Sequence, residues 1–202
     1  MAKGVKKKKS RYRGILLPFQ KITISWSGKG EVKTMTNADM ESYRETLTGE
    51  RLFCGYYLNE LIMLSLHRGD PHEKLFDFYE NTINKLNNKC DIEQTLRIFE
   101  KNFLQEIGYG LNLTHDVSTR TPINPNVTYL YVWGLGAVPQ NSVADNGILI
   151  TGASLLALHE EVFFNELNRR ELKHLTRGII DYQLGGKILK SRRLYSYLFS
   201  NQ

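Results

Sequence analysis

The chain has 202 residues, 41% of them hydrophobic, and a formal net charge of +6. Its length suffices for one large domain or two small ones, each with a core. No apolar run is long enough to span a bilayer, and no signal-peptide core follows the N-terminus, so we expect a cytoplasmic protein. Its two cysteines, Cys54 and Cys90, are too few for a disulfide framework and lack C-x-x-C spacing. No metal site is expected.

The positive charge is concentrated at the N-terminus. The first forty residues contain ten Lys or Arg and two acids, so they carry +8 while the remainder carries −2. Such a cluster attracts a polyanion, because a nucleic acid releases condensed counterions on binding. The alternative is a solvated basic tail that only aids solubility. The residues predicted to contact DNA are Lys3, Lys6, Lys7, Lys8, Lys9, Arg11, Tyr12, Arg13 and Lys29.

Residues 15–38 have the pattern of β-strands. Ile22, Ile24 and Trp26 alternate with polar residues, a two-residue period that predicts one buried face. The turn at 28–30 then joins this strand to a second one. Rings beside cations on a sheet suit single-stranded nucleic acid, because rings stack on bases. We expect Trp26 to be core and Tyr12 to be the better stacking residue.

From Glu50 the apolar period becomes helical, and it predicts three helices that end near residues 69, 88 and 108 and pack as a small bundle. Asp91 is the predicted N-cap of the third helix, with Gln94 as its capping-box partner. Phe99 and Phe103 should be core. Arg97 lies near the edge of that apolar face, where its cation is expected to reach the surface.

Residues 114–146 are the least regular part of the chain. Tyr129, Tyr131 and Trp133 lie on a candidate strand that could pair with 147–150 as a hairpin. His115-Asp116 could form an acid/base or ligand pair, but a loop or capping role is favoured.

Helical patterns follow from Leu155 and over 167–184. A basic segment, 187–199, should lie on the helical domain, with its charge facing either DNA or solvent.

Catalytic motifs are missing from the sequence. Gly28-x-Gly30 lies between strands rather than before a helix, so it is not a phosphate-binding loop. We find no G-x-S-x-G, no paired carboxylates at helical spacing in a polar pocket and no Cys/His metal pattern. This favours a binding protein over an enzyme.

Four stretches in order resemble the bacterial recombination mediator family RecO, in its proteobacterial form. They are KKKKSRYRGILLPFQKITISWSGKGEVKTM, GYYLNELIMLSL, LRIFEKNFLQEIGYGLNL and LGGKILKSRRL, which begin at Lys6, Gly55, Leu96 and Leu184. The resemblance implies an α+β protein, with a partial N-terminal OB-fold over 1–46 and a helical domain with a small hairpin over 47–202.

The resemblance also implies a function. Family members bind single- and double-stranded DNA and anneal complementary strands. With RecR and RecF they help to load RecA onto DNA coated by single-stranded-DNA-binding protein (SSB), which implies association with the nucleoid. By the same resemblance, Arg97 supplies a cation for the acidic, phenylalanine-ended tail of SSB, with Ile98 and Lys101 beside it.

Two departures from the family pattern matter. The region after GYGLNL has no cysteine, so the zinc site of many members is not expected. The family's first strands precede the segment that matches Ala2-Lys3-Gly4, so we expect the natural start to lie upstream of Met1. The alternatives are a remnant with impaired DNA binding and an RNA- or ribosome-associated basic protein.

Overall fold

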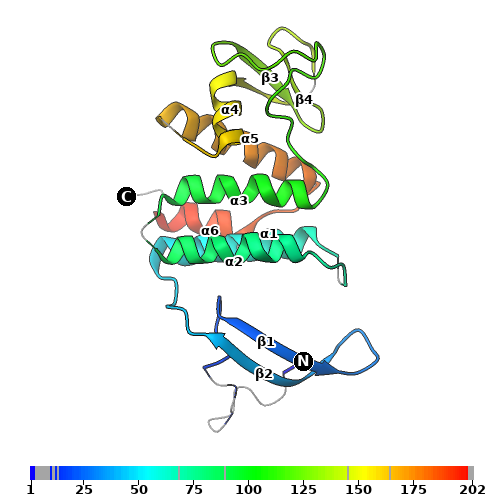
Figure 1. The fold of residues 1–202 in the computed structure, drawn as a ribbon, viewed down its shortest axis with the longest axis vertical. Helices are drawn as coiled ribbons and strands as arrows, with labels where there is room; N and C mark the ends of the chain where they lie inside the picture. Colours follow the sequence, from blue (N-terminus) through cyan, green and yellow to red (C-terminus); the bar gives the residue numbers. More distant parts are fainter. Residues whose placement is uncertain are drawn as a thin grey trace. The chain divides into compact units, whose positions relative to one another are not determined.

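The computed structural model describes residues 1–2, 10, 12, 14–67, 69–88, 90–144, 146–163 and 165–199. Within these residues the chain forms two compact units, Met1–Leu52 and Phe53–Gln202. The first contains antiparallel strands, and the second contains helices with a small sheet (Figure 1). The α+β class predicted from the sequence is therefore confirmed.

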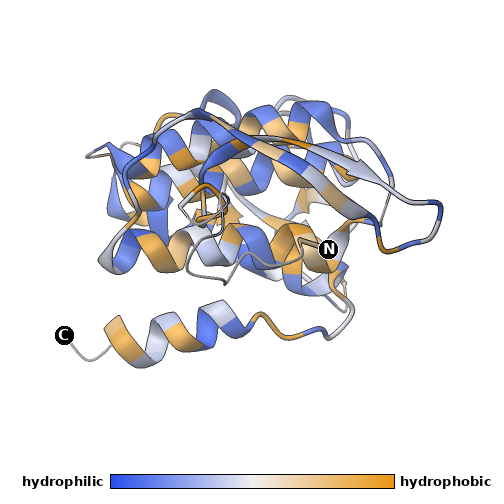
Figure 2. Ribbon diagram, turned by 90° about the horizontal axis from the view of Figure 1, so that it is seen from below, coloured by the Kyte–Doolittle hydropathy of each residue, from blue (hydrophilic) through white to orange (hydrophobic). Residues whose placement is uncertain are grey.

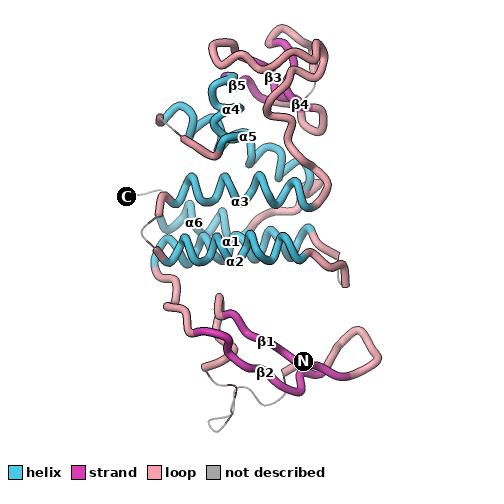
Figure 3. The backbone as a smooth tube through the Cα atoms, in the orientation of Figure 1, coloured by secondary structure: helices cyan, strands magenta, loops and turns pink. Residues whose placement is uncertain are grey.

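The first unit is built on a two-stranded antiparallel ribbon. β1, Lys21–Ser27, pairs with β2, Thr34–Ser42 (Figure 3). The register shifts between Lys21 and Ile22 and again between Ser25 and Trp26. The strands are joined by a turn in which Gly28 has φ +118°, a conformation that favours glycine. β2 extends four residues beyond the predicted end at residue 38.

The predicted buried face of β1 is wrong. Trp26 is 59% exposed and Ile24 is 43% exposed, whereas Trp26 was expected to be core. Within β1 and β2, Ala38 is the one buried residue. Alternation shows which side chains share a face, but burial needs a second layer, and a two-stranded ribbon does not supply one.

The second unit begins with the three expected helices. α1 is Gly49–Ser65, whose first residues belong to the first unit, α2 is Glu73–Asn87 and α3 is Ile92–Glu106. Phe99 and Phe103 stack with ring centroids 6.0 Å apart and are core, as predicted. Other fully buried side chains of these helices are Leu58, Leu61, Leu75, Ile83, Leu86 and Leu104.

The ends of α3 follow the sequence in part. The carboxylate of Asp91 accepts the backbone N–H of Gln94 at 3.0 Å, so the predicted N-cap is confirmed. The reciprocal half of the capping box is not formed; the Gln94 side chain instead donates its amide to the carbonyl of Glu161 at 2.8 Å. Gly108, with φ +90°, ends the helix.

The small sheet has three strands rather than two. β3, Thr128–Val132, pairs with β5, Ile148–Thr151, as the predicted hairpin required. β4, Gly136–Pro139, pairs with the other edge of β3. Sequence periodicity missed β4 because it is short and bounded by glycine and proline, which normally indicate loops.

Two further helices pack beside this sheet. α4, Gly152–Glu160, begins at the N-cap Thr151, and α5, Glu166–Gln183, begins at the N-cap Asn165. Both contact β5, so the sheet lies at the α4–α5 end of this unit (Figure 1).

The last helix, α6, is Lys190–Phe199, and hydrophobic and hydrophilic residues alternate along it (Figure 2). It lies on α1, as expected: Ser191 donates its backbone N–H and hydroxyl to Glu60 at 2.8 and 2.6 Å, and Phe199 contacts Phe53.

Candidate functional site

The basic N-terminal segment is described only in part. Lys3, Lys6, Lys7, Lys8, Lys9, Arg11 and Arg13 lie outside the described residues. Of the other two predicted DNA contacts, Lys29 is exposed in the turn between β1 and β2, and Tyr12 is half-buried. The Tyr12 hydroxyl donates to the carbonyl of Thr36 on β2 at 3.0 Å, which fixes its ring beside that strand.

An exposed ring on β1 was missed by the sequence interpretation. Trp26, 59% exposed, lies three residues before the exposed Lys29. An indole that is open to solvent, with a lysine close by in the sequence, is a stacking surface for a nucleobase. The period-two pattern located the residue, but it could not show that the face is uncovered.

Arg97 on α3 is buried, and the expectation that its cation reaches the surface is wrong. Its side chain is 6% exposed and pairs with Glu100 at 2.7 Å. The same Glu100 oxygen accepts the hydroxyl of Tyr57 on α1 at 2.6 Å. An acid one turn along the helix therefore compensates the buried guanidinium, so the arginine does not need to extend to water.

The buried pair belongs to a wider polar network between α1, α3, α5 and α6. Arg192 donates to the Tyr57 hydroxyl at 3.2 Å and pairs with Asp181 at 2.6 Å. Burial, and then the charge of Glu100, raise the pKa of Tyr57. Among the described residues, Arg97 Nε and Nη1 and Glu100 Oε2 find no hydrogen-bond partner, so the pair is only partly satisfied.

The two neighbours of Arg97 in the predicted tail-docking site have different surroundings. Ile98 is half-buried. The amine of Lys101 lies 2.6 Å from the carboxylate of Glu161 and 3.3 Å from the carbonyl of Leu158. Lys101 therefore neutralises the carboxyl end of α4, where the helix dipole is negative.

A cavity of about 240 Å³ lies between α3 and α5, one helical turn from Arg97. Lys173 pairs with Glu93 there at 2.6 Å, whereas Arg177 forms no ion pair with any described acid. Burial, together with the charges of Arg97 and Arg192, lowers the pKa of Arg177. The cavity therefore carries an uncompensated positive charge, and it is lined by Glu93, Glu166, Arg170, Lys173, His174 and Arg177.

The His115-Asp116 pair has a structural role, as favoured above. Asp116 is 3% exposed, and it accepts the backbone N–H groups of Ser118 and Thr119 at 2.8 and 3.0 Å. Burial acts to raise the pKa of Asp116, but the hydrogen bond from the Ser118 hydroxyl and those from the two backbone N–H groups outweigh it and lower that pKa. The described residues contain no group of three His, Cys, Asp or Glu side chains placed to hold a metal ion. Nor does any helix among them have the length and apolarity to cross a membrane.

Comparison with known proteins identifies the family. The profile described as "Recombination protein O C terminal" matches residues 47–193. "DNA repair protein RecO" of Coxiella burnetii is 40% identical over 196 residues, which cover 96% of this chain and 83% of the relative. The protein of the same name from Dechloromonas aromatica is 41% identical, and the match covers 98% of this chain and 83% of the relative. The one from Nitrosospira multiformis is 38% identical, with 96% of this chain and 81% of the relative covered. The chain therefore belongs to the RecO family.

Proposed function

We propose that this protein acts in DNA repair as a DNA-binding recombination mediator. It anneals complementary single strands and, with RecR and RecF, helps to load RecA onto SSB-coated single-stranded DNA. The observation that carries the proposal is the +8 charge of the first forty residues, in a chain whose relatives are DNA repair proteins. Two DNA strands repel each other through their phosphates. Lysine and arginine side chains bound to both strands reduce this repulsion, so they lower the free-energy cost of bringing the strands together.

The exposed surface of the ribbon supports binding of single strands. Trp26 and Lys29 offer a ring for a base and a charge for a phosphate, without any base-specific contact. In duplex DNA the faces of the bases are stacked on one another and are closed to a protein ring. Stacking contacts of this kind therefore favour single-stranded DNA. Lys6 to Lys9 would add phosphate contacts that are independent of sequence.

The test is a salt titration of binding to labelled single-stranded DNA. Replacing Lys6 to Lys9 by alanine should reduce the slope of log K against log salt by about 3, from roughly 0.7 per lost phosphate contact. The control variant replaces Lys74 and Lys85, which are exposed on α2, and should leave the slope unchanged. An unchanged slope in the Lys6–Lys9 variant would exclude these lysines as DNA contacts.

A second candidate site, for the acidic tail of SSB, is supported by the cavity between α3 and α5. Arg97 is buried and does not line this cavity, and Lys101 is engaged with α4. Arg177 and Arg170, which line the cavity, are therefore the cations we assign to the tail carboxylates. Burial lowers the pKa of Arg177, and the charges of Arg97 and Arg192 lower it further; a carboxylate beside Arg177 would offset that repulsion.

A tail peptide distinguishes this assignment from the one based on resemblance alone. Arg177→Ala should weaken peptide binding about tenfold or more, as expected when a charge-assisted contact is lost. The matched control is Arg193→Ala, because Arg193 is an exposed arginine on α6. If a folded Arg97→Ala variant binds the peptide like the parent, Arg97 is removed from the site.

The main alternative, an RNA- or ribosome-associated protein, is addressed by competition. Single-stranded RNA and DNA of equal length are titrated against the bound labelled DNA. DNA should compete at least as well as RNA if the protein is a DNA mediator. Consistently stronger competition by RNA would favour the alternative.

A further inference from the structure

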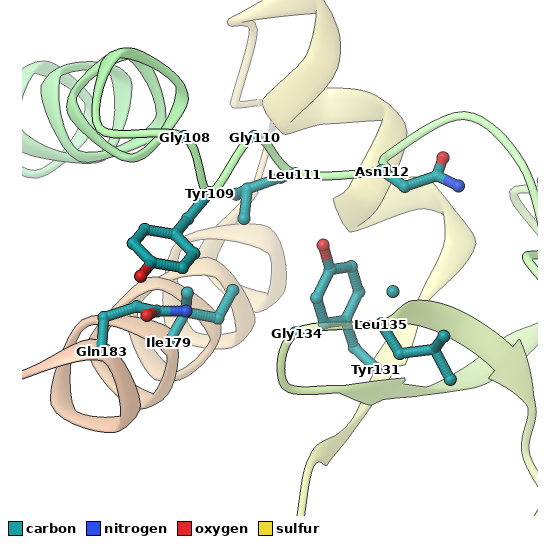
Figure 4. A pocket seen from close by; sticks show the side chains of 11 residues that line it. Gly108, Tyr109, Gly110, Leu111, Asn112, Tyr131, Gly134, Leu135, Ile179 and Gln183 are labelled. Carbon is teal, nitrogen blue, oxygen red and sulfur yellow. The ribbon is translucent and has the colours of Figure 1, made fainter. Parts of the chain in front are cut away.

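Two further hollows of the helical unit differ in what surrounds them. The cavity in Figure 4, of about 140 Å³, is lined by tyrosines, glycines and neutral polar side chains, and none of the described residues that line it carries a charge. Nothing there selects a class of ligand. A groove of about 470 Å³ lies between α1 and α2, and most of its lining is apolar. Its apolar side chains include Ile62, Met63, Leu66, Leu75 and Phe76.

The groove presents apolar surface to solvent. Met63, on its α1 side, is 80% exposed, and Phe76, on its α2 side, is 53% exposed. Inside the groove the Tyr79 hydroxyl donates to the side chain of Asn59 at 2.7 Å, so this hydroxyl is already bonded. Covering the two exposed side chains would remove apolar surface from water, which is the driving force for most protein association.

The outer side of α2 adds negative charge beside this groove. Glu73, Asp77 and Glu80 follow one another at helical spacing, and they lie next to Phe76 on the surface of the helix. The two cations of α2, Lys74 and Lys85, fall on the side of the helix opposite Phe76. The groove therefore combines an apolar floor with an acidic rim.

α6 carries the complementary pattern. Its inner side, which includes Ser191 and Phe199, contacts α1. Its outer side is exposed and includes Lys190, Arg193, Leu194, Tyr197 and Leu198. Surface helices normally present polar residues on this side, whereas three of these five are large and apolar. The outer side of α6 is therefore an apolar stripe with two cations.

The charge of this stripe is not compensated by neighbouring acids in the sequence. From residue 182 to 202 the chain contains no Asp or Glu. The preceding acid, Asp181, is paired with Arg192 at 2.6 Å. Arg193 is exposed and pairs with no acid among the described residues. An acidic, partly apolar surface is therefore the partner that this face fits.

The groove and α6 lie on opposite sides of α1. Phe53 and Glu60, which contact α6, share one face of that helix. Ile62 and Leu66, which line the groove, lie about half a turn away around its axis. A molecule therefore cannot place its α6 in its own groove without leaving the observed fold, but it can offer α6 to a neighbour.

We propose that α6 of one copy docks in the α1–α2 groove of a second copy. The apolar side chains of α6, Tyr197 foremost, cover Met63 and Phe76. Lys190 and Arg193 approach the acidic rim, as in other helix-in-groove contacts. Because the two surfaces differ, the contact is heterologous and can repeat from copy to copy. A nucleic acid fits this stripe less well, because leucines do not stack on bases.

Sedimentation velocity of the full chain without DNA, over a series of protein concentrations, tests the contact. The weight-average sedimentation coefficient of the parent should rise with concentration. Arg193→Glu replaces an attraction by a repulsion and should weaken self-association about tenfold or more. The matched control is Lys85→Glu, which changes the net charge equally on the far side of α2 and should have no effect.

A charge exchange between copies gives the sharper test. Asp77→Arg reverses the rim of the groove and should weaken self-association in the same way as Arg193→Glu. Mixing the two variants should restore association, because the reversed α6 of one variant meets the reversed rim of the other. Met63→Gln and Tyr197→Ala should each weaken association through lost apolar contact. Both side chains are 80% exposed, so circular dichroism should show an unchanged fold.

Three results would overturn the proposal. The first is a parent that remains monomeric at every concentration up to its solubility limit. The second is a mixture of Arg193→Glu and Asp77→Arg that associates no better than either variant alone. The third is Arg193→Glu weakening the binding of an oligothymidylate while self-association is unchanged, which would assign α6 to nucleic acid. DNA binding by the Lys6–Lys9 variant is a separate measurement, so failure here does not affect the proposed function.

Discussion

The β1–β2 ribbon and the helical unit handle similar side chains in opposite ways. In the ribbon, Trp26 and Ile24 stay exposed although they alternate like core residues. In the helical unit, even the charged Arg97 and Glu100 are buried, because neighbouring elements cover them. Burial is therefore decided by the number of layers around a residue and not by its polarity alone.

Because of this difference, we expect side chains of the helical unit to affect stability and exposed side chains of the ribbon to affect ligand binding. Large side chains on the ribbon contribute little to a core, so they are available to a ligand at small cost. Polar groups inside the helical unit are held by packing, so changing them disturbs the fold. The four predictions below test this contrast, from the largest expected effect to the smallest.

The largest effect is expected at the buried ion pair. Glu100→Ala leaves the Arg97 guanidinium and the Tyr57 hydroxyl without their acceptor, and it should lower the free energy of unfolding of the helical unit by about 3–5 kcal/mol. Urea unfolding followed by circular dichroism measures this loss. The matched change in the ribbon is Glu41→Ala, which removes an exposed pair with Lys21 at 3.4 Å and should leave the transition in place.

A double variant tests the interpretation. Arg97→Met combined with Glu100→Leu removes both charges together and should recover part of the stability lost in Glu100→Ala. If the double variant loses as much free energy of unfolding as the two single variants lose together, the loss in Glu100→Ala does not arise from an uncompensated charge.

The next effect concerns a close approach between α5 and the sheet. A methyl group at Gly178 would lie 2.5 Å from the ring of Trp133, so Gly178→Ala should destabilise the helical unit by about 1–3 kcal/mol, despite the better helix propensity of alanine. Thermal unfolding measures it. Adding Trp133→Leu should relieve the contact, and a double variant with no rescue would contradict this packing argument.

In the ribbon, Trp26→Ala should have the opposite profile. Its indole is mostly exposed, so we expect no measurable change in unfolding. Binding to single-stranded DNA should weaken by about 1–3 kcal/mol, because one base loses its stacking partner. Fluorescence anisotropy measures the affinity, and Tyr43→Ala, which removes another exposed ring of the same unit, is the control. Unchanged affinity would remove Trp26 from the interface.

The smallest effect is expected at the N-cap of α3. Asp91→Ala should lower the stability of the helical unit by about 1 kcal/mol. Burial acts to raise the pKa of Asp91, but hydrogen bonds from Gln94 and the ion pair with Arg169 outweigh it and lower that pKa. The carboxylate therefore stabilises the fold fully above the unfolded-state pKa, near 3.8, and this contribution is lost as the pH falls through the lower folded-state pKa.

Unfolding curves at pH 7 and below pH 4 check the cap. The difference in the free energy of unfolding between the parent and Asp91→Ala should become smaller in acid. Asp91→Asn keeps a capping oxygen and loses the charge. Its free energy of unfolding at pH 7 should therefore lie between those of the parent and of Asp91→Ala. A difference that persists unchanged in strong acid would assign the effect to something other than the ionised cap.

The helices and caps could be predicted because their signals are local. The apolar period of 3.6 residues located α1, α2 and α3, and the side chain of Asp91 identified the start of α3. β4 was missed, because a four-residue strand that contains glycine and proline differs little from a loop. The second half of the capping box was also predicted wrongly, since the side chain of Gln94 is directed to the carbonyl of Glu161, 67 residues away in sequence.

The candidate sites were less predictable. The basic segment was visible as composition alone, but the exposure of Trp26 depends on what lies over the ribbon. Arg97 was located on the correct helix, and its burial was missed because the compensating contacts include Tyr57, 43 residues from Glu100. The cavity between α3 and α5 has no sequence motif, because it is lined by residues from elements far apart in the chain.

The sequence by itself determined the family, the α+β class, the accumulation of charge at the N-terminus and most element boundaries, since these depend on residue types and short-range periodicity. The tertiary structure alone decided which rings remain exposed and which charges are buried. These properties depend on contacts between distant segments, and a local pattern carries no information about its long-range neighbours.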